Sequence, residues 1–529
     1  MKRFFRQLSL RIFVIPLLKL AIFPSYFLFR NNFKNLKRIQ EKKLNTLLDG
    51  LQKTEFKDRL DPNGPINYSS FVKVFKPSQY NDWLEFVERE KKGERVFKEK
   101  PFLYQPTSGS SHREKWIPYT QSMMGEFKEA IFPWLFDLFK QFPEIGKGDH
   151  YWSLSWLPTS MREKGRTNDD LSYFPKIHRW LIGNCLCVPS SVTLAKTVEA
   201  SRLATCVYLV AARNLTFIFI WGPTFFLELI EFMMDRKESI VSMLEKGSWE
   251  DFGPDLEVIK PIKDKESARL LKGFQKNLNS EDLMKLWPRL SLISCWDTGT
   301  SLIYAKKLQE LFPNAHIQGK GLFATEGVVT IPFKGDYTLA YRSHFYEFLS
   351  LETNEVIPSW ELKVGMRVSP LISAGNGLLR YHLKDELRVE KGVSSPLSLV
   401  FQGRVEGLDL VGEKMGEDVA KGLLDSLRDD GKSPVSLLGV LNGEKRPFYL
   451  ALFQGEEIEE EQISSLEQKG EEVLLNHFHY KLARELNQLG HFRVKVFPEA
   501  TDYYLDLKKK SGMVEGDIKI DLLTKVHGL

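Results

Sequence analysis

A run of small residues, Thr107 to Ser111 (Thr-Ser-Gly-Ser-Ser), precedes Lys115 and an Ile-Pro pair. Backbone N–H groups and hydroxyls in such a loop can surround phosphate oxygens, and a nearby lysine neutralises their charge. The run is not the nucleotide-binding P-loop, which needs two glycines and ends in Gly-Lys before Ser or Thr. On its own, the run is more typical of a solvated turn than of a phosphate site, so its neighbours in the chain matter.

Thr325 and Glu326 lie in the segment "GKGLFATEG", between two strand-like stretches. A tight turn at this point would present a hydroxyl and a carboxylate together. Mg²⁺ prefers oxygen ligands and bridges carboxylates to phosphates, so Glu326 is a candidate metal ligand beside a nucleotide. The alternative is a Thr/Glu pair that only caps a turn.

Arg380 and Tyr381 follow a glycine turn at residues 375–377, and Asp385 lies four residues after Tyr381. A carboxylate can accept hydrogen bonds from both hydroxyls of a ribose, and an aromatic ring is a common neighbour in a ligand site. Ordinary surface charges on a β-hairpin are the alternative interpretation. The three patterns gain weight because they occur together, in this order, in one chain.

The elements that must position these residues alternate between helix and strand up to residue 402, which predicts an α/β domain. Residues 33–55 have leucines on one helical face, and residues 151–157 and 215–221 are strand-like apolar runs. Gly222-Pro223 begins a further helix, and Pro313 ends another.

The pattern changes from residue 403 onwards. We expect a strand ending at a joint at Gly403-Arg404, a second strand, a helix, a hairpin turning at Asn442-Gly443 and one long helix over 465–486. This segment has the size of an independent α+β domain. The sequence therefore predicts three parts: an N-terminal segment (1–34), a large domain (35–402) and a small, mobile domain (403–529).

The positive charge of the chain is confined to its N-terminal part. Residues 1–43 contain 11 Lys/Arg and one Glu, a net charge of +10, whereas the whole chain carries +5. The remainder is therefore acidic, and we expect no nucleic-acid partner. The apolar stretch 11–30 is broken by a lysine and two prolines and is too short to span a bilayer. We expect it to pack on the large domain, with peripheral membrane contact through residues 1–43 as the alternative.

The four cysteines have no zinc-site spacing and indicate a reducing compartment: Cys185, Cys187, Cys206 and Cys295. We expect a cytoplasmic monomer whose only membrane contact would be peripheral, at the inner face.

Taken together, the three patterns resemble the auxin-responsive acyl-acid amido synthetase family (the Gretchen Hagen family), in its bacterial type, within the adenylate-forming superfamily. "PTSGSSHREKWIPYT" is similar to the family loop S-S-G-T-T-x-x-x-K-x-I-P-x-T, "GKGLFATEG" to its second motif, and "GLLRYHLKDEL" to G-L-Y-R-Y-R-x-G-D-V-V. The resemblance covers residues 35–529. It implies a large N-terminal adenylate-forming domain followed by a smaller, mobile α+β domain.

The resemblance assigns the first motif to ATP. It implies that the phosphates are cradled by four loop residues, Ser108, Gly109, Ser110 and Ser111, with Lys115 near the β/γ end. His112 stands where many relatives have glycine, which restricts the backbone beside the phosphates.

The other two motifs also receive roles from the resemblance. Thr325 would meet the α-phosphate and Glu326 would bind Mg²⁺. Asp385 would bind the ribose hydroxyls, with Tyr381 close to the nucleotide. His382 to Asp385 (His-Leu-Lys-Asp) replaces the family's R-x-G-D, which we interpret as divergence rather than loss of activity.

Three residues of the C-terminal part complete the expected site. Arg404, at the inter-domain joint, could reach the ribose, and Lys414 matches a G-E-K segment of the family. Lys519, in "GDIKIDLL", would be the lysine of the mobile domain. This last match is short, because Asp517 and Asp521 replace the family's Gln and Pro.

The expected activity is that of a ligase that uses ATP and Mg²⁺. It would adenylate a carboxylic acid, release pyrophosphate and transfer the acyl group to an amine, an amino acid in particular. The alternatives are an acyl-CoA ligase and a membrane-associated, inactive binding relative. No motif identifies the acid or the amine.

Overall fold

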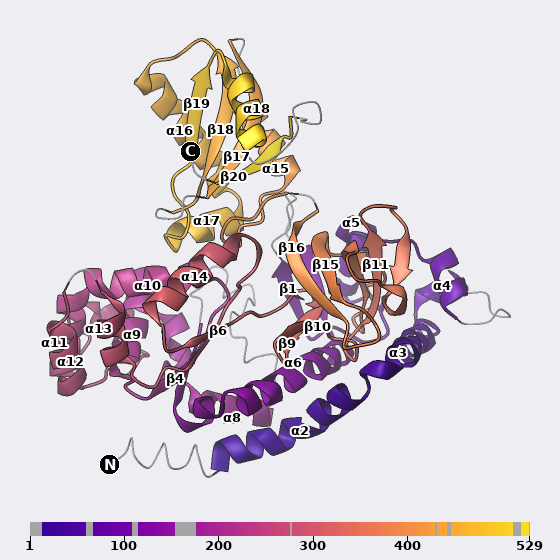
Figure 1. Ribbon diagram of the computed structural model, residues 1–529, viewed down its shortest axis with the longest axis horizontal. Coiled ribbons are helices and arrows are strands. Elements are labelled where there is room, and N and C mark those ends of the chain that lie inside the picture. Colours follow the sequence, from indigo (N-terminus) through magenta and orange to yellow (C-terminus); the bar gives the residue numbers. More distant parts are fainter. Residues whose placement is uncertain are drawn as a thin grey trace. The chain divides into compact units, whose positions relative to one another are not determined.

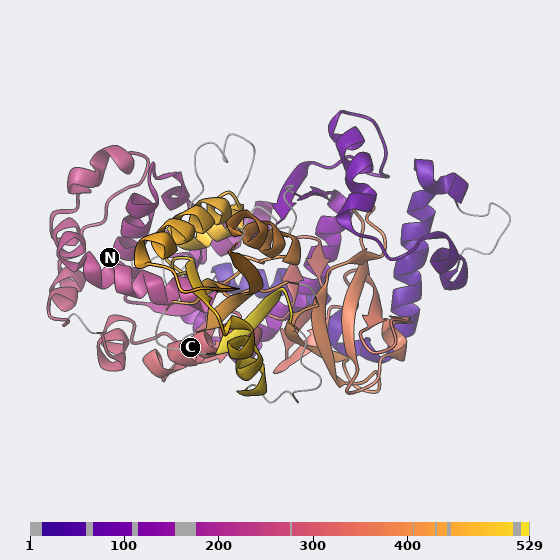
Figure 2. The ribbon, with the colours of Figure 1, turned by 90° about the horizontal axis from the view of Figure 1, so that it is seen from above.

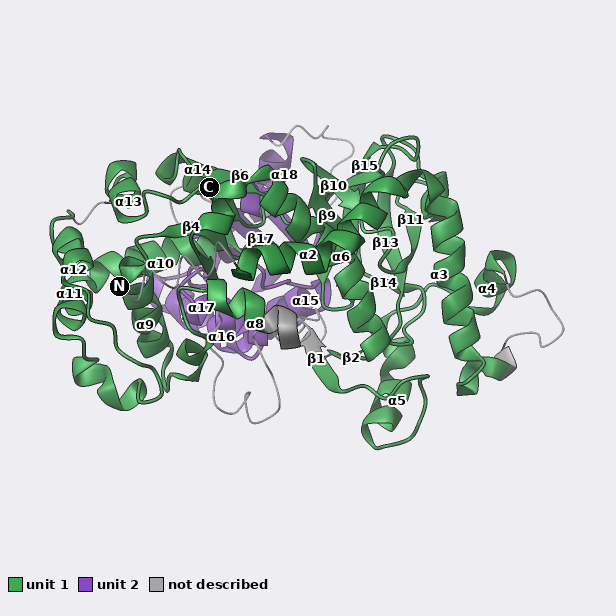
Figure 3. Ribbon diagram, turned by 90° about the horizontal axis from the view of Figure 1, so that it is seen from below, with its two compact units in different colours: residues 1–106, 116–298, 305–402 green, residues 107–115, 299–304, 403–529 purple. Residues whose placement is uncertain are grey.

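The chain folds into two compact units, shown in separate colours in Figure 3. Unit 1 comprises residues 1–106, 116–298 and 305–402, and unit 2 comprises residues 107–115, 299–304 and 403–529. The computed structural model describes residues 13–59, 67–107, 115–153, 176–275, 278–405, 407–428, 431–441, 446–510 and 520–527.

A four-stranded parallel sheet forms one half of unit 1 (Figure 1). Its strands lie side by side in chain order: β3 (Asp149–Trp152), β4 (Leu215–Phe219), β5 (Leu292–Ser294) and β6 (His316–Gln318). All five residues of β4 are buried, as in a strand covered on both faces. The strand predicted over 215–221 is confirmed over 215–219. β3 covers only the start of the predicted 151–157 strand, and residues 154–157 lie outside the described part.

Helices connect and flank these strands. They are α8 (Lys176–Cys185), α9 (Val198–Ala211), α10 (Pro223–Asp235), α11 (Lys237–Lys246), α12 (Lys265–Lys272), α13 (Ser280–Leu286) and α14 (Leu302–Leu311). Proline sets two of the boundaries. Pro223 is the first residue of α10, where its missing N–H costs no hydrogen bond, and α14 ends two residues before Pro313. Both boundaries agree with the sequence prediction.

An antiparallel sheet forms the other half of unit 1. Its strands follow the order β12-β11-β13-β15-β16-β10-β9, with β14 paired to β13. They are β9 (Thr330–Phe333), β10 (Asp336–Leu339), β11 (Phe345–Ser350), β12 (Val356–Pro358), β13 (Arg367–Ser373), β14 (Tyr381–His382), β15 (Asp385–Lys391) and β16 (Ser398–Arg404). β13, with six of its seven residues buried, pairs with β11, β14 and β15.

Helices from the N-terminal third cover this sheet. They are α2 (Ile15–Asn31), α3 (Leu36–Leu51), α4 (Tyr68–Val74), α5 (Tyr80–Lys91) and α6 (Gln121–Gln141). α2 packs on α6, and α3 lies against β11, beside the orange sheet in Figures 1 and 2. The Gln40 amide of α3 donates to the carbonyls of Tyr341 (2.8 Å) and His344 (2.9 Å). None of the described helices is long and apolar enough to cross a membrane.

Unit 2 contains a mixed four-stranded sheet in the order β19-β18-β17-β20. Its strands are β17 (Lys432–Leu441), β18 (Phe448–Gly455), β19 (Arg493–Phe497) and β20 (Leu523–His527), and its helices are α15 (Glu417–Leu427), α16 (Glu460–Leu475), α17 (Phe478–Glu485) and α18 (Ala500–Lys510). β17 and β18 pair antiparallel, as predicted, while the predicted Asn442-Gly443 turn lies outside the described residues. The predicted fold class, a large α/β domain with a smaller α+β domain, is confirmed.

The single long helix predicted over 465–486 is wrong, because α16 and α17 are separate helices. His477, between them, has an extended backbone (φ −91°, ψ 116°) and begins α17. The break lets Tyr480 and Arg484 of α17 bond to Glu471 of α16, at 2.8 and 2.6 Å. Tertiary hydrogen bonds therefore override a helical periodicity that is continuous in the sequence.

The second strand predicted after Gly403-Arg404 is also wrong, because a loop follows β16. Leu408 makes only an isolated bridge to Met415. The buried carboxylate of Glu413 accepts the N–H groups of Leu410 (2.7 Å) and Val411 (2.8 Å), and it also accepts the Tyr449 hydroxyl. The N–H groups of Leu410 and Val411 therefore donate to the Glu413 side chain instead of to a neighbouring strand.

Burial of Glu413, and secondly the negative charge of Asp409, raise its pKa to about 7 from an ordinary value of 4.5. Protonated Glu413 therefore stabilises the folded state. This contribution is complete below pH 4.5 and is lost as the pH rises through 7, and it amounts to about 3 kcal/mol at most. We predict that Glu413→Gln lowers the melting temperature at pH 5 and that the difference from wild type shrinks by pH 8.

Thermal unfolding followed by circular dichroism at five pH values between 5 and 8 checks this prediction. Glu456→Gln, at an exposed position of the same unit, is the matched control and should follow the wild-type pH profile. Parallel profiles for wild type and Glu413→Gln would contradict the role given to this carboxyl group.

Candidate active site

Two short strands flank the predicted phosphate loop in the chain. β1 (Leu103–Thr107) and β2 (Lys115–Tyr119) form a two-stranded sheet. Lys115 is the first residue of β2, and the Trp116 N–H donates to the Tyr80 hydroxyl at 2.9 Å. The loop residues themselves, Ser108 to Ser111 with His112, lie outside the described residues.

The second motif is a β-hairpin with Thr325 and Glu326 as its two-residue turn. β7 (Phe323–Ala324) pairs antiparallel with β8 (Gly327–Val328), so Thr325 and Glu326 form the tight turn that the sequence predicts. Glu326 is 9% exposed. Gly327 is required by a close approach, since a Cβ atom at this position would lie 2.7 Å from Nε2 of His344.

Residues 118–120 hold the second and third motifs together. The Tyr119 hydroxyl donates to the Thr325 carbonyl at 2.9 Å, which fixes the hairpin turn. The Thr120 hydroxyl donates to the Gly375 carbonyl at 3.1 Å, and the Asn376 amide donates to the Pro118 carbonyl at 3.2 Å. The strand that leaves the predicted phosphate loop is therefore bonded to both other motifs.

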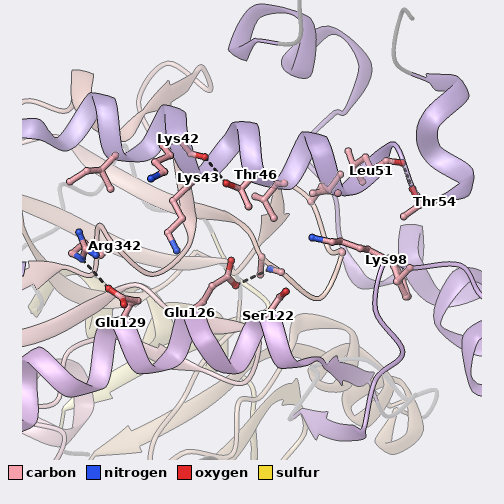
Figure 4. A pocket seen from close by; sticks show the side chains of 18 of the residues that line it. Lys42, Lys43, Thr46, Leu51, Thr54, Lys98, Ser122, Glu126, Glu129 and Arg342 are labelled. Carbon is pink, nitrogen blue, oxygen red and sulfur yellow. Dashed lines mark hydrogen bonds and ion pairs between the residues drawn. The ribbon is translucent and has the colours of Figure 1, made fainter. Parts of the chain in front are cut away.

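A buried His–Glu pair makes a second connection between the same two motifs. Nε2 of His344 accepts the Val328 N–H of the hairpin at 3.2 Å, so the ring proton is on Nδ1 and donates to Glu126 at 2.9 Å. The same Glu126 oxygen accepts the Gly375 N–H at 2.8 Å. Glu126 belongs to α6, and Figure 4 shows its carboxylate turned toward the bonded backbone.

The third motif contains a buried ion pair and, further along the chain, a buried carboxylate. The guanidinium of Arg380 makes two hydrogen bonds, of 2.8 and 2.9 Å, to the carboxylate of Glu347, and both side chains are buried. Burial raises the pKa of Glu347, and Arg380 opposes that rise. Arg380 thus fixes the start of β14, where Tyr381 pairs with Ile372, and Asp385 begins β15 as a buried carboxylate.

The remaining predicted residues belong to unit 2. Arg404 is the last residue of β16, and Lys414 follows Glu413 in the loop before α15, with a left-handed backbone (φ 51°). Lys519 lies outside the described residues. The elements that carry Thr325, Glu326, Tyr381 and Asp385 therefore all belong to unit 1. Arg404 and Lys414 belong to unit 2.

A buried lysine next to the hairpin was missed by sequence reasoning. Lys320 is 1% exposed, and its Nζ lies over the rings of Phe219, Trp221 (4.8 Å from the centroid) and Trp134 (5.5 Å). Phe323 of the hairpin contacts the same tryptophans, with centroids 6.0 and 5.7 Å away. The only sequence signal was the position of Lys320 inside "GKGLFATEG".

A pocket of about 520 Å³ opens between α3, α6 and the segment 374–379 (Figure 4). Cations line it, and they include Lys42, Lys43, Lys98 and Arg342, the last paired with Glu129 at 2.9 Å. Burial lowers the pKa of Lys43. None of the predicted site residues lines this pocket, although Gly375, Gly377 and Leu379 at the start of the third motif do.

Comparison with known proteins agrees with this geometry. The model of the GH3 family N-terminal domain matches residues 28–317, and that of the GH3 family central domain matches residues 337–404. The chain is similar to the indole-3-acetic acid-amido synthetase GH3.15 of Arabidopsis thaliana, with 21% identity over 407 residues, 70% of this chain and 68% of the relative.

Solved structures show the same fold. The GH3.15 acyl acid amido synthetase in complex with 2,4-DB has a TM-score of 0.63 and 19% identity, covering 94% of this chain and 93% of that chain. A second GH3.15 structure has a TM-score of 0.61 and 18% identity, covering 94% of this chain and 92% of that one. This chain belongs to the GH3 family, whose N-terminal and central domain models match it.

Proposed function

We propose that the chain is an ATP-dependent ligase that activates a carboxylic acid as its acyl-adenylate and then forms an amide with an amine, an amino acid in particular. Membership of the GH3 family supports this reaction, as does the amido synthetase activity named for the Arabidopsis relative. The observation that carries the proposal is the set of hydrogen bonds that connects residues 118–120 with the Thr325 turn and the Gly375 turn.

In the first step, a carboxylate oxygen of the acid attacks the α-phosphorus of ATP, and the bond to the β-phosphate oxygen breaks. The products are the acyl-adenylate and pyrophosphate. In this proposal Ser108 to Ser111 and Lys115 hold the phosphates, and the Thr325 hydroxyl meets the α-phosphate. Asp385 accepts the ribose hydroxyls, with Tyr381 beside the nucleotide. Positioning and charge neutralisation supply the catalysis, and no enzyme nucleophile is required.

The residues present suit a Mg²⁺ ion that is held largely by the nucleotide. Among the described residues no group of three His, Cys, Asp or Glu side chains could enclose a metal ion. Mg²⁺ at nucleotide sites needs only one or two carboxylates in addition to phosphates, and Glu326 at the hairpin turn offers one. When bound, the ion would neutralise phosphate charge.

In the second step, the amine nitrogen attacks the acyl carbon, the carbon–oxygen bond to AMP breaks, and the amine proton passes to solvent or a base. We assign Arg404, Lys414 and Lys519 of the C-terminal part to this stage. We also propose that the large domain spans residues 35–402 and the small domain residues 403–529. Closure of the small domain would shield the adenylate from water. Coenzyme A is the competing acceptor, and product analysis with coenzyme A and with an amino-acid mixture separates the two.

The aromatic cluster around Lys320 is our candidate for the acid subsite. Trp134, Phe219 and Trp221 offer apolar rings to the body of the acid, and Phe323 connects them directly to the Thr325-Glu326 turn. An ammonium group surrounded by apolar rings attracts a carboxylate more strongly than one in water. Lys320 would therefore draw the reacting carboxylate toward the α-phosphate.

We predict that Glu326→Gln lowers pyrophosphate–ATP exchange by about 100-fold, because the amide cannot replace a charged metal ligand. The measurement is exchange of labelled pyrophosphate with full-length protein, over a panel of aromatic, fatty and hydroxy acids and a Mg²⁺ titration. Glu352→Gln, in the exposed turn between β11 and β12, is the matched control. Exchange that survives Glu326→Gln would reject this carboxylate as the metal ligand, and no exchange or ATP binding by folded wild type would reject the ligase.

We also predict that Lys320→Met raises the KM for the acid by roughly 10- to 100-fold and leaves the KM for ATP within a factor of three, since methionine keeps the length and removes the charge. Initial rates with varied acid and varied ATP measure both constants. Lys363→Met, at an exposed position, should change neither. Equal effects on both constants would show that Lys320 only supports the fold.

A further inference from the structure

Helix α2 is apolar on both of its sides, but only one side is covered. Ile15, Leu18, Ile22, Tyr26 and Phe29 are buried, and the helix packs on α6. The opposite side, with the preceding residue Phe13, carries six large apolar side chains that are between 41% and 71% exposed: Phe13, Leu17, Leu20, Phe23, Phe27 and Leu28. We call these six residues the outer face of α2.

The six side chains of the outer face form one apolar surface, unlike the other exposed apolar residues, which are scattered. The first five members recur at spacings of three and four residues, and Leu28 follows Phe27 directly, which places all six on one broad side of a helix. The other ten exposed large apolar residues in the described part of the chain lie in ten different helices or loops. Contiguous apolar surface of this kind marks a site of interaction, because single exposed residues are ordinary but grouped ones are not.

The charges around the outer face select an anionic partner. The first acidic residue of the chain is Glu41, whereas residues 1–40 contain nine Lys/Arg. Four cations between the last turn of α2 and the middle of α3 are exposed: Arg30, Lys34, Arg38 and Lys42. Exposed cations close to an anionic bilayer are attracted to its surface.

A bilayer surface fits this combination better than a second copy of the chain does. Two outer faces brought together would oppose cations to cations, since neither presents an acidic residue along α2. A spanning segment is excluded for α2, because its inner side is committed to α6 and no described helix is long and apolar enough to cross a membrane. A helix of 17 residues extends about 25 Å, so it can lie flat with only its outer half in the interface.

We propose that α2 docks this protein on anionic phospholipid surfaces, with the outer face inserted at the boundary of headgroups and acyl chains and with Lys34, Arg38 and Lys42 on the lipid phosphates. The inference is independent of the proposed ligase activity. Its side chains do not belong to the three motifs, so docking and catalysis can be separated by mutation.

The test is co-sedimentation of full-length protein with vesicles of phosphatidylcholine alone and of phosphatidylcholine with 30% phosphatidylglycerol. We expect binding to the anionic vesicles, at least tenfold weaker binding to the neutral ones, and weakening between 0.1 and 0.5 M NaCl. Leu20→Asp/Phe27→Asp should reduce binding at least tenfold, and so should Arg38→Glu/Lys42→Glu. Val258→Asp/Val364→Asp, which changes two scattered exposed residues, should bind as wild type.

Sedimentation velocity and pyrophosphate–ATP exchange without lipid are measured on the same variants. Unchanged exchange with lost vesicle binding supports docking by α2. Wild-type binding by Leu20→Asp/Phe27→Asp, or equal binding to neutral and anionic vesicles, overturns the proposal. A wild-type dimer that this variant dissociates also overturns it, because a second copy would then cover the outer face.

Discussion

Hydrogen bonds made by three consecutive residues are the constraint on which the site depends: the Pro118 carbonyl accepts one, and the hydroxyls of Tyr119 and Thr120 donate one each. They connect the strand that leaves the predicted phosphate loop to the Thr325 turn and to the Gly375 turn. Both turns lie more than 200 residues away in the chain, so no local preference could bring them to this strand. Two of these bonds are partly buried and the third is buried. Loss of one partner of a buried hydrogen bond lowers the free energy of unfolding by about 1 to 3 kcal/mol. Side-chain hydrogen bonds therefore hold the second and third motifs to residues 118–120 before any ligand binds.

The buried pair of His344 and Glu126 makes this arrangement rigid. Glu126 accepts from the ring of His344 and from the N–H of Gly375, so one carboxylate serves the hairpin and the glycine turn. The ion pair of Arg380 and Glu347 fixes the next strand in the same way. Buried polar groups that are fully satisfied specify a single arrangement. Such preorganisation suits a reaction in which the enzyme positions charges and contributes no nucleophile.

The sequence could predict the fold class and the local form of the site, but not the contacts that assemble it. The hairpin turn at Thr325-Glu326 and the helix boundaries at Pro223 and Pro313 follow from residues adjacent in the chain. Glu126 has the pattern of an ordinary helix carboxylate, and nothing in its neighbourhood indicates His344. Lys320 is unpredictable for the same reason, since its ring partners come from α6 and β4. The helix break at His477 and the loop held by Glu413 also arise from tertiary bonds.

The most direct test of the central claim is hydrogen exchange of the full-length protein, titrated with a non-hydrolysable ATP analogue and Mg²⁺. If the motifs form one nucleotide site, exchange should slow in the peptides covering 115–120, 323–328 and 374–385, and all three should respond with the same half-saturating concentration. Slowing in only one of these segments, or three different half-saturating concentrations, would contradict the account.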